Sequence, residues 1–206
     1  FPGNAMATDI AAIVRHLEAF YPFKDKTVLH VGAGGGQFIG YAAHARRVVG
    51  VDPDPEAVDR LKTAVREAGL QDRFHVLRAD LMTVTEKADV VFFEFCLHEI
   101  ADPAAALRHA RALAPQTIIV DPAPGSKWAW YCGEEEKVVR SWAAVDQDPP
   151  ALVARFIGKQ SFHDYGELAA KIGMLGEPTL TRIAEFRERT DFEIEMPYRM
   201  ALLATG

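Results

Sequence analysis

Hydrophobic residues along the chain follow two different spacings that alternate. Helical spacing dominates residues 7–20 and 55–68, where apolar side chains recur every three or four positions. Short runs rich in β-branched and aromatic residues are typical of strands, and they lie at residues 27–31, 47–51, 74–77, 89–95 and 117–120. Strands that alternate with helices predict right-handed crossovers and a mostly parallel sheet covered on both faces.

The alternation fails at residue 121. Residues 121–166 contain all three tryptophans and the acidic run 134–136, so we interpret them as a helical insertion that covers the carboxyl edge of the sheet. A further helix is predicted at residues 164–172. Two strand-like runs, at 179–186 and 198–204, then predict a C-terminal antiparallel hairpin.

The composition of the chain argues against some classes of binding partner. A formal net charge of -6 argues against a nucleic-acid partner, which favours a basic surface. No apolar run reaches the roughly 18–20 residues that span a bilayer, and the first residues do not resemble a leader peptide. Two cysteines do not suggest a disulfide scaffold. We therefore expect a cytoplasmic protein without nucleic-acid or membrane partners.

A glycine-rich turn follows the first strand and opens a helix. It contains Gly32, Gly34 and Gly36, and the absence of side chains there lets a ligand approach the main chain closely. Asp52 ends the next strand, 20 residues after Gly32, where an acidic side chain can accept hydrogen bonds from ribose hydroxyls. The alternative is that Asp52 caps the helix that begins near residue 55.

This turn differs from the common phosphate-binding turns. A dinucleotide turn needs glycine or alanine at position 37 or 39, where this chain has Gln37 and Ile39. No Gly-Lys-Ser/Thr sequence follows the turn either. The pattern favours a ligand that has a ribose but no phosphate.

Residues 28–36 resemble the first motif of the class I S-adenosylmethionine-dependent methyltransferases, whose three glycines correspond to Gly32, Gly34 and Gly36. The resemblance continues through Asp52 and residues 78–80 and covers roughly residues 26–121. It implies that S-adenosylmethionine is the cofactor and S-adenosylhomocysteine the product. His30 departs from the family pattern, which has an aliphatic residue there, and we interpret it as a core histidine.

The resemblance also implies a role for each cofactor-binding residue. The glycine turn faces the methionine part, Asp52 holds the ribose, and Asp80 accepts from the adenine amino group while Leu81 packs on the ring. The complete set of implied cofactor-binding residues is Gly32, Ala33, Gly34, Gly36, Asp52, Pro53, Asp80, Leu81 and Phe95.

The methyl acceptor is expected beside the end of the fourth strand, where ligands of such sheets lie. Residues 94–99 lack the Asp/Asn-Pro-Pro-Tyr/Phe signature of enzymes that methylate planar amino groups of DNA bases or glutamine. His98 in this stretch is the predicted catalytic base or substrate-binding residue, and the alternative is a helix-capping or cofactor-packing role. Cys96 is interpreted as a small buried side chain rather than a reactive thiol.

A metal ion is not expected. Glu94 and Asp121 end neighbouring strands and His98 follows one of them, which is a conceivable ligand set. However, His98-Glu99 lacks the second histidine of a zinc-binding helix, and Asp121 is followed by Pro122 rather than by the asparagine of metal-dependent catechol-type enzymes.

Aromatic residues of the insertion are predicted to form an aromatic and acidic lid over the acceptor. Such a lid can hold a cationic amine by ring faces, or a flat apolar ring. The alternative is that these rings pack the insertion onto the sheet. The residues assigned to substrate binding, together with His98, are Trp128, Trp130, Tyr131 and Tyr165.

The sequence thus predicts an α/β domain with a doubly wound, mostly parallel, seven-stranded sheet, a C-terminal antiparallel hairpin and a helical insertion. Its expected parts are an N-terminal helix, a cofactor-binding core, an insertion or lid, and a last helix with the hairpin, at residues 1–24, 25–121, 122–166 and 167–206. The predicted reaction is in-line methyl transfer to a nitrogen or oxygen of a small molecule. The alternatives are a tRNA or protein methyltransferase, and a protein that binds S-adenosylmethionine without catalysis.

Overall fold

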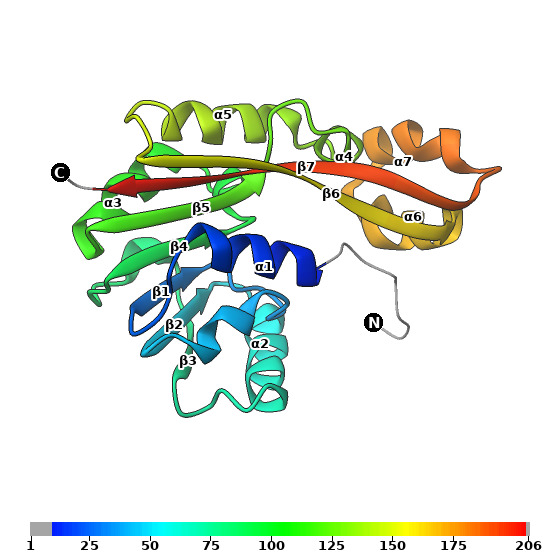
Figure 1. Ribbon diagram of the computed structural model, residues 1–206. Coiled ribbons are helices and arrows are strands. Elements are labelled where there is room, and N and C mark those ends of the chain that lie inside the picture. The colour runs from blue at the N-terminus through cyan, green and yellow to red at the C-terminus, as the bar shows by residue number, and fades with distance from the viewer. Residues whose placement is uncertain (1–9, 205–206) are drawn as a thin grey trace.

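A computed structural model describes residues 10–204 and contains one mixed sheet flanked by helices (Figure 1). The strand order across the sheet is β3-β2-β1-β4-β5-β7-β6. Strands β1 to β5 are parallel, and β7 is antiparallel to both of its neighbours. The strands are β1 (Thr27–Val31), β2 (Arg47–Asp52), β3 (Phe74–Arg78), β4 (Val90–Glu94), β5 (Gln116–Pro122), β6 (Leu152–Asp164) and β7 (Thr190–Ala204).

Helices cover both faces of the sheet, as the alternation of strands and helices predicts. Residues of α1 and α2 pack with one set of strand residues, and residues of α3 and α5 pack with the alternate set. The α-helices are α1 (Ile10–Phe20), α2 (Pro55–Glu67), α3 (Pro103–Leu113), α4 (Lys127–Cys132), α5 (Glu135–Val145), α6 (Tyr165–Ile172) and α7 (Glu177–Ile183). Short 3-10 helices are η1 (Ile39–Ala43), η2 (Leu81–Thr83), η3 (Leu97–Glu99), η4 (Gly173–Leu175) and η5 (Ala184–Phe186).

The first five strands confirm the sequence prediction and form the part of the sheet that carries the glycine turn. Strand β4 is buried along its whole length, which is why its sequence is apolar up to the final residue, Glu94. Only the short 3-10 helix η1 follows the glycine turn, instead of a full helix. The helix predicted at residues 7–20 is α1, and its first three predicted residues lie outside the described part of the chain.

The C-terminal hairpin prediction is wrong in its first strand. Residues 179–186 form α7 and η5, and the buried residues Thr179, Ile183 and Phe186 follow helical spacing that the β-branched composition obscures. The strand that pairs with β7 is β6, which lies inside the predicted helical insertion. Because β6 is an edge strand with one solvated face, its sequence lacks the apolar run by which a central strand is recognised.

The antiparallel pair of β6 and β7 extends beyond the rest of the sheet as a long ribbon (Figure 1). Residues 165–189, which contain α6 and α7, connect the two strands in place of a short turn. Helix α4 packs against β7, and α6 packs against β6. Among residues 10–204 there is no helix with the length and apolar character needed to cross a membrane.

Candidate functional site

A cavity of about 600 Å³ opens at the carboxyl ends of the parallel strands. Its wall includes Gly32 after β1, Asp52 at the end of β2, and Asp80 with Leu81 after β3. Residues that follow β4, among them Cys96 and Glu99, complete the wall. Several residues expected at the cofactor thus line one cavity, because parallel strands end at one edge of the sheet.

The glycine turn has a backbone that side chains would disturb. Gly32 and Gly36 have φ angles of 69° and 77°. A Cβ atom at Gly36 would lie 2.6 Å from the Cβ of Ala64 in α2, and one at Gly32 would overlap the Cys96 side chain. Glycine at these positions thus allows both the turn and the close packing of α2 and the β4 loop against it.

Asp52 is held by backbone amides at the cavity wall. The amide of Gly34 donates to its Oδ2 at 3.2 Å, and the amide of Asp54 donates to its Oδ1 at 3.0 Å. The N-cap of α2 is Asp54, whose carboxylate accepts from the amides of Glu56 and Ala57. The helix-capping role considered for Asp52 therefore belongs to Asp54, and Asp52 faces the cavity.

The other residues expected at the cofactor divide into two groups. Pro53, Asp80 and Leu81 line the cavity, and Asp80 also accepts a hydrogen bond from the amide of Met82 at 2.8 Å. The lining residues do not include Ala33, Gly34, Gly36 or Phe95.

Phe95 directs its ring away from this cavity. The ring packs 5.5 Å from that of Phe38 and 5.9 Å from that of Tyr198. Its φ angle is 44°, in the left-handed region, where the chain turns after β4. Cys96, expected to be buried, is only half-buried, lines the cavity and donates its thiol to the carbonyl of Val31 at 3.3 Å.

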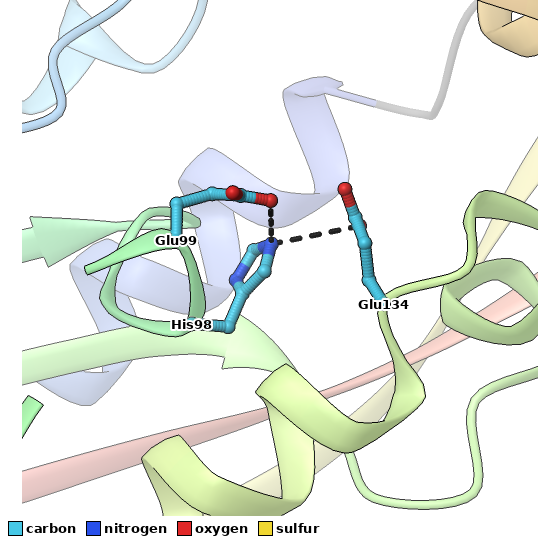
Figure 2. A group of neighbouring side chains, drawn as sticks. All are labelled: His98, Glu99 and Glu134. Atoms are coloured by element: carbon cyan, nitrogen blue, oxygen red, sulfur yellow. Dashed lines mark ion pairs between the residues drawn. The ribbon is translucent and has the colours of Figure 1, made fainter. Parts of the chain in front are cut away.

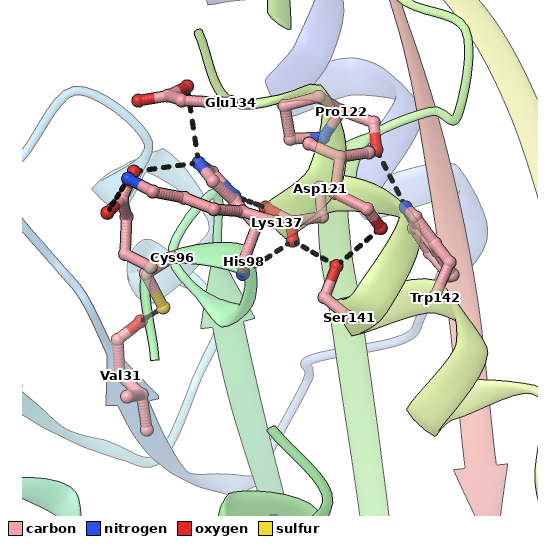
Figure 3. A network of polar contacts seen from close by, with 11 residues as sticks. Val31, Cys96, His98, Asp121, Pro122, Glu134, Lys137, Ser141 and Trp142 are labelled. Atoms are coloured by element: carbon pink, nitrogen blue, oxygen red, sulfur yellow. Dashed lines mark hydrogen bonds and ion pairs between the residues drawn. The ribbon is translucent and has the colours of Figure 1, made fainter. Parts of the chain in front are cut away.

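His98 lies in a buried polar network beside the cavity (Figure 3). It belongs to η3, is 5% exposed, and its Nδ1 lies 2.7 Å from Oδ1 of the fully buried Asp121 at the end of β5. Oδ2 of Asp121 accepts from the backbone amide of His98 at 3.0 Å and from the hydroxyl of Ser141 at 3.4 Å. Asp121 thus fixes both the position and the ring orientation of His98.

The other ring nitrogen of His98 points toward two carboxylates (Figure 2). Its Nε2 lies 3.4 Å from Oε1 of Glu99 and 3.6 Å from Oε2 of Glu134, which precedes α5. Lys137 holds the second oxygen of Glu99 at 2.8 Å. Burial lowers the pKa of His98, but its contacts with Asp121, Glu134 and Glu99 outweigh that effect and raise the pKa to about 11.

Glu94, considered as a ligand together with Asp121 and His98, has a different partner. Its Oε2 lies 2.6 Å from Nε2 of His30, and both side chains are buried. Burial lowers the pKa of His30 to about 3 and raises the pKa of Glu94 well above its usual range. His30 also stacks on Phe92 at 4.6 Å, which confirms that it is a core histidine.

The aromatic residues assigned to the lid pack among the residues around the ribbon. Trp128 is buried and stacks on Phe162 at 6.0 Å, and the buried Tyr131 donates to Oε1 of Glu185 at 2.6 Å. Trp130 is 42% exposed and its ring lies beneath the guanidinium of Arg182. The ring of Tyr165 lies 5.9 Å from the guanidinium carbon of Arg187. The cavity wall, as described for residues 10–204, includes none of these four rings.

Glu99 and Glu134 are site residues whose role the sequence did not reveal. Glu99 directly follows His98 in the segment after β4, and this position in the sequence is the feature that could have indicated its place beside His98. Glu134 belongs to the acidic run and reaches His98 only because α5 packs beside η3.

Comparisons with known proteins agree with the geometry of the cofactor side. Residues 29–120 match a family model described as a methyltransferase domain. The ribosomal protein L11 methyltransferase of Alkaliphilus oremlandii is 38% identical over 97 residues, which are 44% of this chain and 31% of that protein. The chain therefore spans about a third of the length of this curated relative.

Solved structures of similar shape extend over nearly the whole chain. A protein from Bacillus halodurans assigned as a methyltransferase has a TM-score of 0.66 and 15% identity, with 94% of this chain and 97% of that chain covered. Magnesium protoporphyrin IX methyltransferase from Synechocystis, solved with bound S-adenosylmethionine, has a TM-score of 0.57 and 17% identity, with 93% and 77% covered. These likenesses concern the fold.

Proposed function

We propose that this chain, whose residues 29–120 form a methyltransferase domain of the class I, S-adenosylmethionine-dependent type, transfers the cofactor's methyl group to a nitrogen or oxygen of a small molecule. One observation carries the proposal. The cavity at the strand ends combines the glycine turn and the two acidic side chains Asp52 and Asp80 with a neighbouring cluster of ionisable groups around His98.

The residues of the cavity wall fit the cofactor. Its volume of about 600 Å³ lies within the range of small-molecule sites, about 300–1,000 Å³. Asp52 is fixed by two backbone amides and offers its carboxylate to ribose hydroxyls, while Asp80 is placed for the adenine amino group and Leu81 for its ring. When bound, the cofactor supplies an activated methyl group, so the protein must mainly align the acceptor.

A small acceptor is favoured by the charges beside the cavity. Glu99, Asp121 and Glu134 surround His98 within a chain of net charge -6. Such a surface repels the phosphates of a nucleic acid, which argues against a tRNA acceptor. In this proposal His98 is an acceptor-side residue, and Trp128, Trp130, Tyr131 and Tyr165 hold the segment beside it in place.

A protein acceptor is the second candidate. The observation that favours it is the 38% identity to a methyltransferase named for ribosomal protein L11. The identity covers 97 residues, which are less than half of this chain. We therefore rank a protein acceptor below a small molecule.

Turnover with radiolabelled cofactor tests the proposal. The enzyme is incubated with small amines and phenols, with a small-molecule extract, with ribosomal proteins and with RNA, and labelled products are separated by size. Label in small molecules supports the proposal, whereas label confined to protein or RNA replaces it with the corresponding alternative. Calorimetry tests the cofactor assignment: we expect S-adenosylmethionine and S-adenosylhomocysteine to bind and NAD and ATP not to bind. Preferential binding of NAD overturns the cofactor assignment.

A substitution of His98 tests its place on the acceptor side. His98→Ala is expected to lower turnover by about 10²-fold, while the affinity for S-adenosylhomocysteine stays within about twofold of the wild type, a change of under half a kcal/mol. A variant that binds the cofactor poorly and turns over normally at saturation would instead assign His98 to cofactor packing.

A further inference from the structure

We propose that His98, Glu99 and Glu134 form a binding site for a divalent transition-metal ion at the edge of the cavity. The three ligand atoms, one from each side chain, lie within 4.8 Å of one another (Figure 2). The site itself does not depend on methyl transfer.

The spacing of the ligand atoms matches a common metal ion. Metal–nitrogen and metal–oxygen bonds of about 2.0–2.2 Å place neighbouring ligands of one ion about 3.0–3.5 Å apart. Nε2 of His98 lies 3.4 Å from Oε1 of Glu99 and 3.6 Å from Oε2 of Glu134. Both separations exceed the 2.7–3.2 Å typical of a well-formed N–H···O hydrogen bond. A buried imidazole nitrogen thus faces two carboxylates at the distance that a shared ion requires.

The residues behind His98 orient it as a ligand. Metal-binding histidines usually donate their second ring N–H to a carboxylate, which fixes the tautomer that leaves the other nitrogen free for the ion. Nδ1 of His98 has this contact with Asp121, at 2.7 Å. Asp121 is fully buried and is held in turn by the His98 amide and the Ser141 hydroxyl.

The local charges also favour a divalent cation. The carboxylates of Glu99, Asp121 and Glu134 face a single ammonium group, that of Lys137. The raised pKa of His98 means that the ion must displace the proton on Nε2 as it binds. The set then carries two uncompensated negative charges, which an ion of charge two balances. Imidazole as a ligand favours iron, nickel, copper or zinc over magnesium or calcium, which prefer all-oxygen sites.

Three protein ligands leave coordination positions for another molecule. Glu99 lines the cavity, so those positions open toward the space beside the cofactor. This last step rests on the proposed function: an acceptor bearing a hydroxyl, phenol or carboxylate oxygen is the substrate class that such an ion would hold.

Metal binding by the full chain, without cofactor or acceptor, tests the site. The protein is stripped with EDTA and titrated with Mn²⁺, Co²⁺, Zn²⁺ and Mg²⁺ by calorimetry, and the visible absorption of the Co²⁺ form reports nitrogen and oxygen ligation. The expected result is one transition-metal ion per chain and weaker binding of Mg²⁺. His98→Ala and Glu134→Gln are each expected to weaken binding tenfold or more and to change the Co²⁺ spectrum, and Asp121→Asn to weaken it by about 10–100-fold.

Glu136→Gln is the matched control, because Glu136 is an exposed acid of the same run that lies outside the ligand set. It should bind the metal as the wild type does. The proposal is overturned if the wild type binds none of the transition metals at millimolar concentration, or if the Glu136 variant loses as much affinity as the Glu134 variant. Circular dichroism verifies that each variant is folded. Because no methyl transfer is measured, failure of the proposed activity leaves this result intact, and the reverse also holds.

Discussion

The two segments of the chain on either side of Pro122 use their large side chains differently. In residues 27–122, aliphatic residues together with Phe74, Phe92 and Phe93 fill both faces of the sheet, while small residues, apolar residues and carboxylates surround the cavity at the strand ends. In residues 123–204, the rings stack on one another: Trp128 packs on Phe162, and Phe162 packs on Phe192. This second segment lies around the ribbon of β6 and β7 rather than over the strand ends (Figure 1).

The contrast between the two segments shows which residue types indicate a binding surface in this fold. The polar groups of the cavity wall, such as Asp52 and Asp80, add little to the hydrophobic core and remain available to a ligand, while Val31, Val51 and Leu81 of the same wall are core residues. The aromatic residues of the second segment are mostly buried in the hydrophobic core that also contains residues of α1 and α2. A concentration of tryptophan and tyrosine next to the cavity therefore indicates packing here, with the exposed Trp130 as the exception.

The largest expected effect concerns stability in the second segment. Trp128→Ala should lower the free energy of unfolding by about 3–5 kcal/mol, because it removes a buried ring that stacks on Phe162. Trp130→Ala, two residues along the same helix, should cost about 1 kcal/mol or less, because that ring is 42% exposed and mainly supports Arg182. Urea denaturation followed by far-ultraviolet circular dichroism measures both.

The same pair of variants tests whether the rings of the second segment are packing residues. If Trp128→Ala leaves the unfolding free energy nearly unchanged and instead raises the acceptor's KM, the ring belongs to a lid and not to the hydrophobic core. Trp130 is the matched control, since both residues lie in α4 and carry the same side chain.

The two segments also differ in how much of their structure can be predicted from the sequence. The strands up to β5 and the position of Asp52 are predictable because each depends on a short stretch of chain: a strand, a turn and the next strand. The cluster around His98 is predictable only in part: Asp121 ends the strand next to the one that precedes His98, whereas Glu134 comes from the start of another helix. Residue types alone do not reveal which distant carboxylates a fold brings to one histidine.

The C-terminal segment shows a second reason for failure. Most positions of strand β6 alternate between partly buried and exposed, and charged residues such as Arg155 and Lys159 interrupt its apolar residues, so the sequence suggests part of an irregular insertion. Helix α7 is short and contains β-branched residues, so it reads as a strand. Tertiary packing overrides the local preference in both cases, since β6 pairs with β7 and α7 packs against α4 and α6.

The second prediction concerns the cavity wall. Asp52→Ala removes a carboxylate that offers charge-assisted hydrogen bonds to two ribose hydroxyls, and the expected loss of cofactor binding is about 2–3 kcal/mol, or roughly 30–150-fold in affinity. Calorimetry with S-adenosylhomocysteine measures this loss without turnover. Asp54→Ala is the matched control: it removes the N-cap of α2 and should cost about 1 kcal/mol of stability with little change in affinity. Equal affinity losses in the two variants would assign both acids to holding the turn.

The smallest expected effect lies where the two segments meet. Arg199 of β7, 8% exposed, forms two hydrogen bonds with Asp146 at 3.0 and 2.6 Å, and its guanidinium lies 4.3 Å from the ring of Trp142 in α5. The hydrogen bonds to Arg199 lower the pKa of Asp146 below its usual value. A carboxyl group with a lowered folded-state pKa contributes stability above the pKa of the unfolded state, near 3.9, and that stability is lost as the pH falls through the folded value.

Asp146→Asn should therefore destabilise the protein at pH 7 by about 1 kcal/mol, the upper range for a half-exposed ion pair with two hydrogen bonds. The difference between variant and wild type should shrink as the pH falls below about 4, because the wild-type carboxyl then becomes protonated as well. Urea denaturation of both proteins across this pH range measures the difference in their free energies of unfolding. Because the remaining carboxylates titrate in both proteins, their contribution cancels in this difference. A difference that stays constant with pH would mean that the aspartate acts through packing, and the link between α5 and β7 would then rest on Arg199 and Trp142 alone.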